Sequence, residues 1–140
     1  MKKSNKGFSL VELIIVIAIM AILIAVLAPQ YLKYVEKTKR STDAKAFGEV
    51  VQATEVAIAD PVLNPTSTSV TCSWNGAAFT VSGSALQQEV NEVINGTNTN
   101  TLTAKSKLFK NGTTSVTFTI DSNGNWSKGS SGAFESYVNY

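Results

Sequence analysis

Residues 6–31 read KGFSLVELIIVIAIMAILIAVLAPQY, and this stretch dominates the organisation of the chain. From Leu13 to Ala28 every residue is uncharged and nearly every one is aliphatic. A helix from Phe8 to Ala28, rising about 1.5 Å per residue, would span roughly 30 Å, the thickness of the hydrocarbon core of a bilayer. The stretch is therefore predicted to be a helix that can cross a membrane.

The position of the small residue Gly7 separates this segment from an ordinary secretory signal peptide. Such a peptide has its small-residue cleavage site after the apolar stretch, whereas Gly7 comes before it. At the other end, Pro29 directly follows Ala28 and makes cleavage there unfavourable. A carboxylate, Glu12, also lies within the first turns, at a cost of about 2.5–3.5 kcal/mol at a bilayer centre and less near the interface. A charge retained at that cost indicates a function.

The charge of the chain is concentrated before the apolar stretch. The formal net charge of +2 depends on three lysines that precede it, Lys2, Lys3 and Lys6. These lysines favour a cytoplasmic location for the N-terminus. Without them the chain is close to neutral, so we expect no nucleic acid partner, because phosphate binding needs basic side chains clustered on one face.

The glycine, aromatic residue, glutamate and apolar run together resemble the N-terminus of type IV pilins and their pseudopilin relatives. In that family a dedicated membrane peptidase removes a short basic leader after a glycine, and the new N-terminus is methylated. The resemblance implies cleavage after Gly7, methylation of Phe8, and a role for Glu12 as the acid five residues into the mature chain. Pro29 and Tyr31 also match positions where short-leader pilins commonly carry these residues.

This resemblance implies a structural subunit of a type IV pilus, and the presence of Glu12 favours a major pilin. Expected partners are other copies of the chain in a helical filament, the membrane before assembly, the prepilin peptidase and methyltransferase, and the assembly machinery. The expected location is the bacterial cell membrane, crossed once, and then an extracellular surface fibre for adhesion, motility or aggregation. Two alternatives stay open: a pseudopilin of a type II secretion or competence system, and a plain membrane anchor.

Phe8 and Glu12 suggest how copies could align. Once the leader is removed, the α-amine of Phe8 is largely protonated near neutral pH. In a staggered stack this cation can meet the Glu12 carboxylate of a neighbour, and any other stagger leaves two uncompensated charges in an apolar core. Pro29 removes one backbone donor, and either a kink with local melting or a gentle bend is expected there.

The pattern after Pro29 predicts a globular head. We expect a leader over residues 1–7, a transmembrane and polymerisation helix over 8–33, and a head over 34–140. The helix is predicted to continue to about Ala59, where Asp60-Pro61 stops it. Its apolar stripe, expected to pack on the head, consists of Phe47, Val50, Val51, Thr54 and Ile58.

The remainder predicts an α+β head, in which the long helix packs on an antiparallel sheet. Residues 60–83 read as a loop with one or two short strands and with Cys72, Trp74 and Phe79 buried. A second helix is predicted over residues 84–95, N-capped by Ser84 with Gln87 three residues on and ended by Gly96. Asn111-Gly112 and Asn123-Gly124 are strong hairpin signals. Strands are predicted over 104–110, 114–121, 125–128 and 133–140, with Leu108, Val116, Phe118, Ile120 and Trp126 covering the helix.

The chemistry-bearing residues are few. Cys72 is the only cysteine, so no intrachain disulfide is possible, whereas many pilins have one near the C-terminal strands. The chain has no histidine, which excludes metal sites of the Cys and His type, and no cofactor is expected. No glycine-rich phosphate loop or paired acids with a nucleophile occur, so the chain is not expected to be an enzyme.

Overall fold

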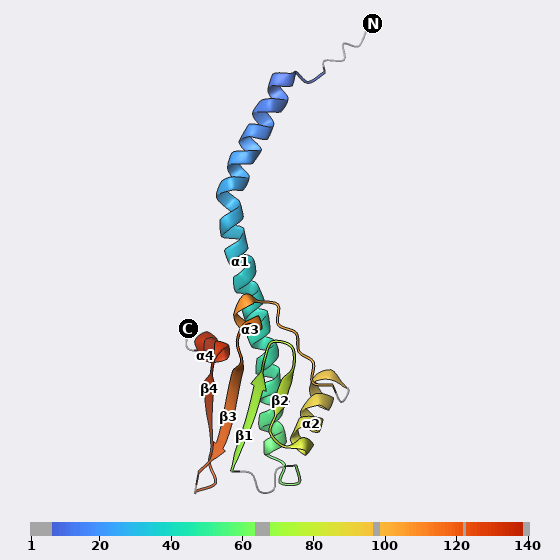
Figure 1. Cartoon of the computed structure of the whole chain (residues 1–140), viewed down its shortest axis with the longest axis vertical. Coiled ribbons are helices and arrows are strands. Elements are labelled where there is room, and N and C mark those ends of the chain that lie inside the picture. Colours follow the sequence, from blue (N-terminus) through green and yellow to red (C-terminus); the bar gives the residue numbers. More distant parts are fainter. Residues whose placement is uncertain (1–6, 64–67, 97–98, 122, 139–140) are drawn as a thin grey trace. The chain divides into compact units, whose positions relative to one another are not determined.

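The computed structural model describes residues 7–63, 68–96, 99–121 and 123–138, and the chain divides into two compact units, residues 1–35 and 36–140 (Figure 1). The elements in chain order are α1 (Leu10–Ile58), β1 (Ser69–Trp74), β2 (Phe79–Val81), α2 (Ser84–Asn95), α3 (Lys107–Lys110), β3 (Thr114–Ile120), β4 (Trp126–Ser131) and α4 (Ala133–Val138). The predicted α+β class, a long helix with an antiparallel sheet, is confirmed.

The first unit consists of the N-terminal part of α1. Residues 7–34 are all exposed, including the whole aliphatic run. Among the described residues, α1 is the one helix that is long and apolar enough to cross a membrane. A helix that is apolar on every side has no face for water, which fits a segment surrounded by lipid or by other helices.

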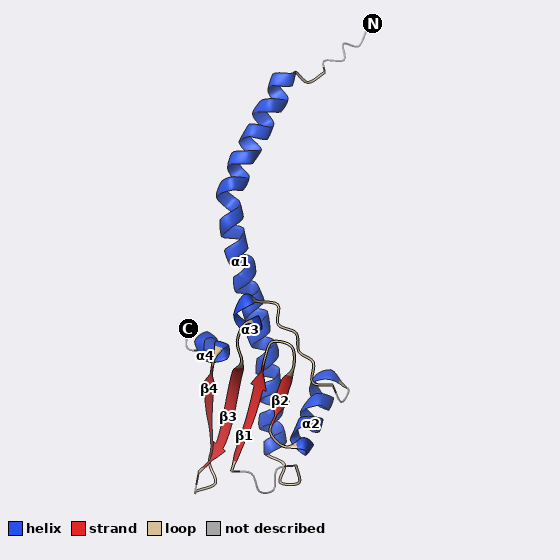
Figure 2. Ribbon diagram, viewed as in Figure 1, coloured by secondary structure: helices blue, strands red, loops and turns tan. Residues whose placement is uncertain are grey.

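The second unit is built on a four-stranded antiparallel sheet in the order β2-β1-β3-β4 (Figure 2). The central pair aligns Cys72 of β1 with Val116 of β3. Strand residues alternate between buried and more exposed positions, as expected for a sheet with one face on the core. The outward face carries hydroxyl pairs across the strands, such as Thr71 with Thr117 at 3.1 Å and Thr119 with Ser127 at 2.8 Å.

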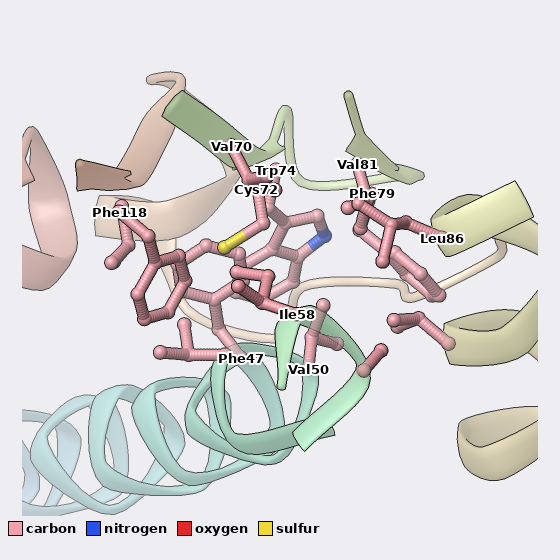
Figure 3. Packing of buried hydrophobic residues seen from close by; sticks show 14 of the residues in the cluster. Phe47, Val50, Ile58, Val70, Cys72, Trp74, Phe79, Val81, Leu86 and Phe118 are labelled. Atoms are coloured by element: carbon pink, nitrogen blue, oxygen red, sulfur yellow. The ribbon is translucent and has the colours of Figure 1, made fainter. Parts of the chain in front are cut away.

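The core lies between the sheet and the C-terminal half of α1 (Figure 3). The predicted stripe on α1 is buried, with Phe47 and Val50 fully inaccessible to solvent. The Phe47 and Trp74 rings stack with their centroids 5.7 Å apart, and Trp74 also lies 5.2 Å from Phe109. Cys72 is buried among these side chains, as predicted, together with Phe79. Trp126 is less buried than expected, with 38% of its surface exposed beside the end of α1.

The predicted strand over residues 104–110 is wrong. Residues 107–110 form α3, and Ser106 caps this helix by accepting a hydrogen bond from the Phe109 nitrogen. The backbone nitrogens of Lys105 and Ser106 bond to the buried carboxylate of Asp43 on α1 and so are not available to a strand ladder. Asn111-Gly112 consequently follows a helix and is not a hairpin turn.

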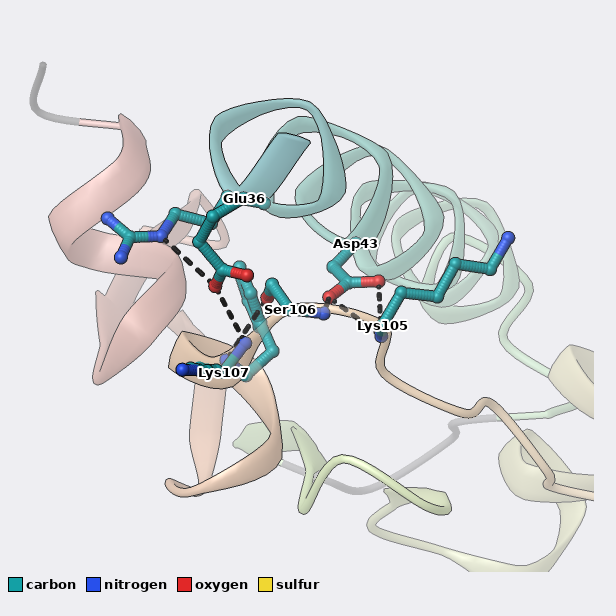
Figure 4. A network of polar contacts seen from close by, with 7 residues as sticks. Glu36, Asp43, Lys105, Ser106 and Lys107 are labelled. Atoms are coloured by element: carbon teal, nitrogen blue, oxygen red, sulfur yellow. Dashed lines mark hydrogen bonds and ion pairs between the residues drawn. The ribbon is translucent and has the colours of Figure 1, made fainter. Parts of the chain in front are cut away.

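Two carboxylates of α1 hold this loop in place (Figure 4). Asp43, only 2% exposed, accepts bonds from Lys105 at 3.0 Å and Ser106 at 2.7 Å. Glu36, two helical turns earlier, accepts a bond from the Lys107 nitrogen at 2.7 Å. Glu36 also lies 3.6 Å from Arg40. Polar side chains of α1 therefore contact the rest of the head, in addition to the contacts that its apolar stripe makes.

The predicted strand over residues 133–140 is also wrong for residues 133–138, because β4 ends at Ser131 and α4 follows; residues 139 and 140 lie outside the described residues. Gly132 makes the reversal with φ +77°, a conformation that side chains disfavour. A Cβ at Gly132 would also lie 2.5 Å from the Thr113 carbonyl oxygen. The turn places Phe134 edge-on against Phe47, with centroids 5.2 Å apart.

The other predicted elements are confirmed with small changes. The strands over 114–121 and 125–128 correspond to β3 and β4, and Asn123-Gly124 lies in the turn between them. One or two short strands were expected within residues 60–83, and the structure has two, β1 and β2. α2 covers residues 84–95 and ends at Gly96 in the left-handed conformation, but Ser84 is not its cap. Gly83 takes that position, while the Gln87 side chain accepts a bond from the Val81 nitrogen.

Candidate functional site

The predicted cleavage position lies outside the helix. Residues 7–9 have no regular secondary structure and are exposed, and α1 begins at Leu10. Phe8 is 94% exposed, and a Cβ built on Gly7 would meet no atom within 4 Å. The peptide bond between Gly7 and Phe8 is therefore accessible in the described structure.

Ser9 and Glu12 form a reciprocal cap at the start of α1. The Ser9 hydroxyl accepts a hydrogen bond from the Glu12 nitrogen at 3.2 Å, and the Glu12 carboxylate accepts one from the Ser9 nitrogen at 2.7 Å. This is a capping box, which satisfies two backbone donors that a helix start leaves without intrahelical partners. The sequence signal for this cap is Ser9-x-x-Glu12 before an apolar run, and Ser9 was not among the predicted site residues.

The capping box places the Glu12 carboxylate one turn from the residue that cleavage would make the N-terminus. A carboxylate has about four acceptor sites, and capping the Ser9 nitrogen uses one of them. An ammonium group from another chain could therefore bind Glu12 while the cap persists. The helix cap that the structure shows at Glu12 and the pairing with a cation that the sequence predicts for it are chemically compatible.

Pro29 lies inside α1, and the helix continues on both sides of it. Gly7, Phe8 and Glu12 are within six positions of one another, whereas Pro29 is more than four helical turns away along the same helix. The structure thus brings together the predicted cleavage and register residues and leaves the predicted kink position separate from them.

Cys72 is the one nucleophilic thiol, and it is remote from this N-terminal segment in the sequence and buried in the head. Burial raises the pKa of its thiol to about 11. A thiol that stays protonated in an apolar core is a poor nucleophile. Cys72 is therefore a small core residue and not part of a reactive site.

Comparison with protein-family models gives a match at this segment. The family described as "Prokaryotic N-terminal methylation motif" matches residues 2–28. These residues include Gly7, Phe8 and Glu12 together with most of the aliphatic run. No solved structure matches the chain.

Several curated relatives are fimbrial proteins. The chain is 40% identical over 60 residues to "Type IV major fimbrial protein FimA" of Dichelobacter nodosus, covering 43% of this chain and 38% of the relative. It is 41% identical over 56 residues to "Fimbrial protein" of Pseudomonas aeruginosa, covering 40% and 36%. A third relative, "Prepilin peptidase-dependent protein A" of Clostridium perfringens, is 29% identical over 83 residues, covering 58% and 59%.

The chain thus spans between 36% and 59% of the length of these relatives. The fimbrial relatives are structural subunits, of a family not known to be enzymatic. The methylation motif, the fimbrial relatives and the long apolar helix of an α+β protein together support a type IV pilin.

Proposed function

We propose that this chain is the major structural subunit of a type IV pilus and polymerises through its N-terminal helix into an extracellular fibre. The observation that carries the proposal is the exposed apolar half of α1, preceded by an accessible Gly7–Phe8 bond and interrupted by one carboxylate, Glu12. Before assembly this helix crosses the membrane once. In the fibre it packs against the same helix of neighbouring copies, because both surroundings are apolar.

Maturation in this proposal divides the chain into the functional parts that the sequence predicted. The prepilin peptidase removes residues 1–7, and the same family of enzymes methylates the amine of Phe8. Residues 8–33 then serve as the membrane and polymerisation helix, and residues 34–140 form the surface of the fibre. The methylation motif over residues 2–28 supports this processing.

Register in the fibre comes from the pairing of the Phe8 amine with Glu12 of a neighbour. Each mature copy has one cation at its end and one anion a helical turn further on. A buried pair with one partner missing is destabilised by about 3–5 kcal/mol, so staggers that leave these charges unpaired are disfavoured. Pro29 acts in the same helix as a point where the backbone can bend or locally unwind during packing.

Electron microscopy of cells from which the chain has been deleted tests the proposal. Loss of all long surface fibres, with recovery when the wild-type chain is restored, is the expected result. Unchanged fibres combined with lost protein secretion or DNA uptake would instead assign the chain to a pseudopilin filament. Adhesion, twitching motility and aggregation are then compared between the two strains to determine what the fibre does.

A further inference from the structure

The charged side chains of the globular unit are strongly segregated along the sequence. Residues 46–104 contain no lysine or arginine. Their five acidic residues are Glu49, Glu55, Asp60, Glu89 and Glu92. The basic residues of the head all lie on either side of this stretch, and one of them, Lys128, pairs with Glu55 at 3.7 Å.

Folding brings the basic residues from both sides of this stretch to the same level of the globular unit, around residues 36–45 of α1, and we call this set the basic collar. Its members are Lys37, Lys39, Arg40, Lys45, Lys105, Lys107 and Lys110, and all seven are exposed. The bonds from the backbone of residues 105–107 to Asp43 and Glu36 hold the two sequence segments together (Figure 4). These two acids, of which Glu36 also lies 3.6 Å from Arg40, face seven basic side chains, so positive charge predominates in the collar.

The acidic segment forms a groove between α1 and α2, which we call the acidic groove. It has a volume of about 500 Å³ and is lined by Glu49, Gln52, Ala53, Val56, Ala57, Asp60, Leu63, Glu89, Val93 and Ile94. Two of its apolar residues are unusually open to solvent, Val56 at 70% and Val93 at 62% exposure. Its lining therefore combines apolar side chains with three carboxylates and no cation.

We infer that the acidic groove is the docking site for the basic collar of another copy of this chain, in the fibre proposed above. Lysine and arginine suit such a groove, because their aliphatic stems cover apolar surface while their charged ends reach carboxylates. The groove and the collar are also complementary in sign, and complementary charges select one partner orientation over others.

Charge reversal in the full-length chain, expressed with its assembly machinery, tests the contact. The variant Glu49→Lys with Glu89→Lys reverses one acid on each helix inside the groove. Its control, Glu55→Lys with Glu92→Lys, reverses one acid on each of the same helices outside the groove lining. We expect the yield of sheared filaments to fall at least about 10-fold in the groove variant and to change less than about 2-fold in the control, because like charges placed in contact oppose assembly.

The reciprocal variant, Lys105→Glu with Lys107→Glu, should lower filament yield similarly. Combining it with the groove variant should restore the yield to within about 3-fold of the wild type, since the charges are again opposite. Equal yields from the groove variant and its control would overturn the inference, as would a combined variant that stays defective while its processed subunit is present in the membrane. Absence of wild-type filaments would instead refute the proposed function.

Covalent cross-linking identifies what occupies the groove. Cys72 is fully buried, so a chain with Glu89→Cys and Lys107→Cys has its two new thiols as the reactive pair. Mild oxidation of intact filaments should produce a ladder of linked copies that neither single variant gives. Linkage to a different protein in place of the ladder, or no linkage in intact filaments, would show that another copy does not occupy the groove.

Discussion

Asp43 and Ser106 are 63 residues apart in the sequence, yet the Asp43 carboxylate accepts a hydrogen bond from the Ser106 nitrogen at 2.7 Å. The same carboxylate accepts from the Lys105 nitrogen through both of its oxygens at 3.0 Å. Asp43 thus works as a tertiary cap for an irregular loop. It satisfies buried backbone donors that would otherwise lack partners.

Replacing Asp43 with alanine should destabilise the head. The change leaves the nitrogens of Lys105 and Ser106 without acceptors, and a buried unsatisfied donor costs about 1–3 kcal/mol. We expect a loss of about 2–4 kcal/mol in the free energy of unfolding, measured by urea denaturation of a fragment covering residues 34–140. Asp43→Asn, which retains one acceptor oxygen, should lose less. A stability equal to that of the unaltered fragment would show that the carboxylate does not hold the loop.

The fragment that covers residues 34–140 is itself predicted to fold on its own. The buried core lies within residues 44–133, whereas residues 7–34 are wholly exposed. A chain that begins at Tyr34 should therefore be a soluble monomer that unfolds cooperatively, with circular dichroism typical of mixed helix and sheet. An unfolded or aggregated fragment would show that the apolar half of α1 is needed for the head to fold.

Processing should occur between Gly7 and Phe8. The bond is exposed and lies outside α1, which suits a peptidase that needs extended backbone. Intact-mass analysis of surface protein should give a chain that starts at Phe8 with one added methyl group. Gly7→Leu should leave the unprocessed chain in the membrane. A mature chain that begins at Pro29 or later would refute the proposed function, because the polymerisation helix would be gone.

Two substitutions separate the capping and pairing roles of Glu12. Glu12→Gln retains a side chain that can complete the capping box but removes the charge. Ser9→Ala retains the charge and loses the cap, at a cost of about 0.5–2 kcal/mol to the helix start. We expect few or no fibres from Glu12→Gln, with processed subunit accumulating in the membrane, and substantial fibres from Ser9→Ala. Normal fibres from Glu12→Gln would show that the carboxylate charge does not set register.

Alkaline pH should destabilise the head through Cys72. Burial raises the pKa of this thiol from 9.0 to about 11, so the folded state binds its proton more tightly than the unfolded state does. The resulting stability is fully present below pH 9 and is lost as the pH rises toward 11. Between pH 9 and 11, the free energy of unfolding of the residue 34–140 fragment, measured with urea, should therefore fall more steeply than that of its Cys72→Ala variant. An equal loss of unfolding free energy with pH in the two fragments would show that the Cys72 thiol is not its cause.

The sequence by itself determined the features that depend on local composition and spacing. The apolar run predicted a helix that can lie in a membrane, because all of its residues are compatible with apolar surroundings. The stripe from Phe47 to Ile58 predicted a buried helix face, because its residues recur at helical spacing. Asn123-Gly124 and Gly96 were interpreted correctly because their conformations depend on a few neighbouring residues. The Gly7, Phe8 and Glu12 pattern is also local, within six residues of the chain, and the roles assigned to these residues stay predictions.

Only the tertiary structure decided the features that depend on partners distant in sequence. Residues 104–110 precede Asn111-Gly112, a hairpin signal, but Asp43 binds the backbone donors that a strand would need, and the local sequence does not reveal this distant acceptor. Residues 133–138 form a helix because Gly132 reverses the chain and the Phe134 ring packs against the Phe47 ring. The basic collar is also a tertiary feature, because its lysines come from two segments that are joined only when Glu36 and Asp43 bind the loop.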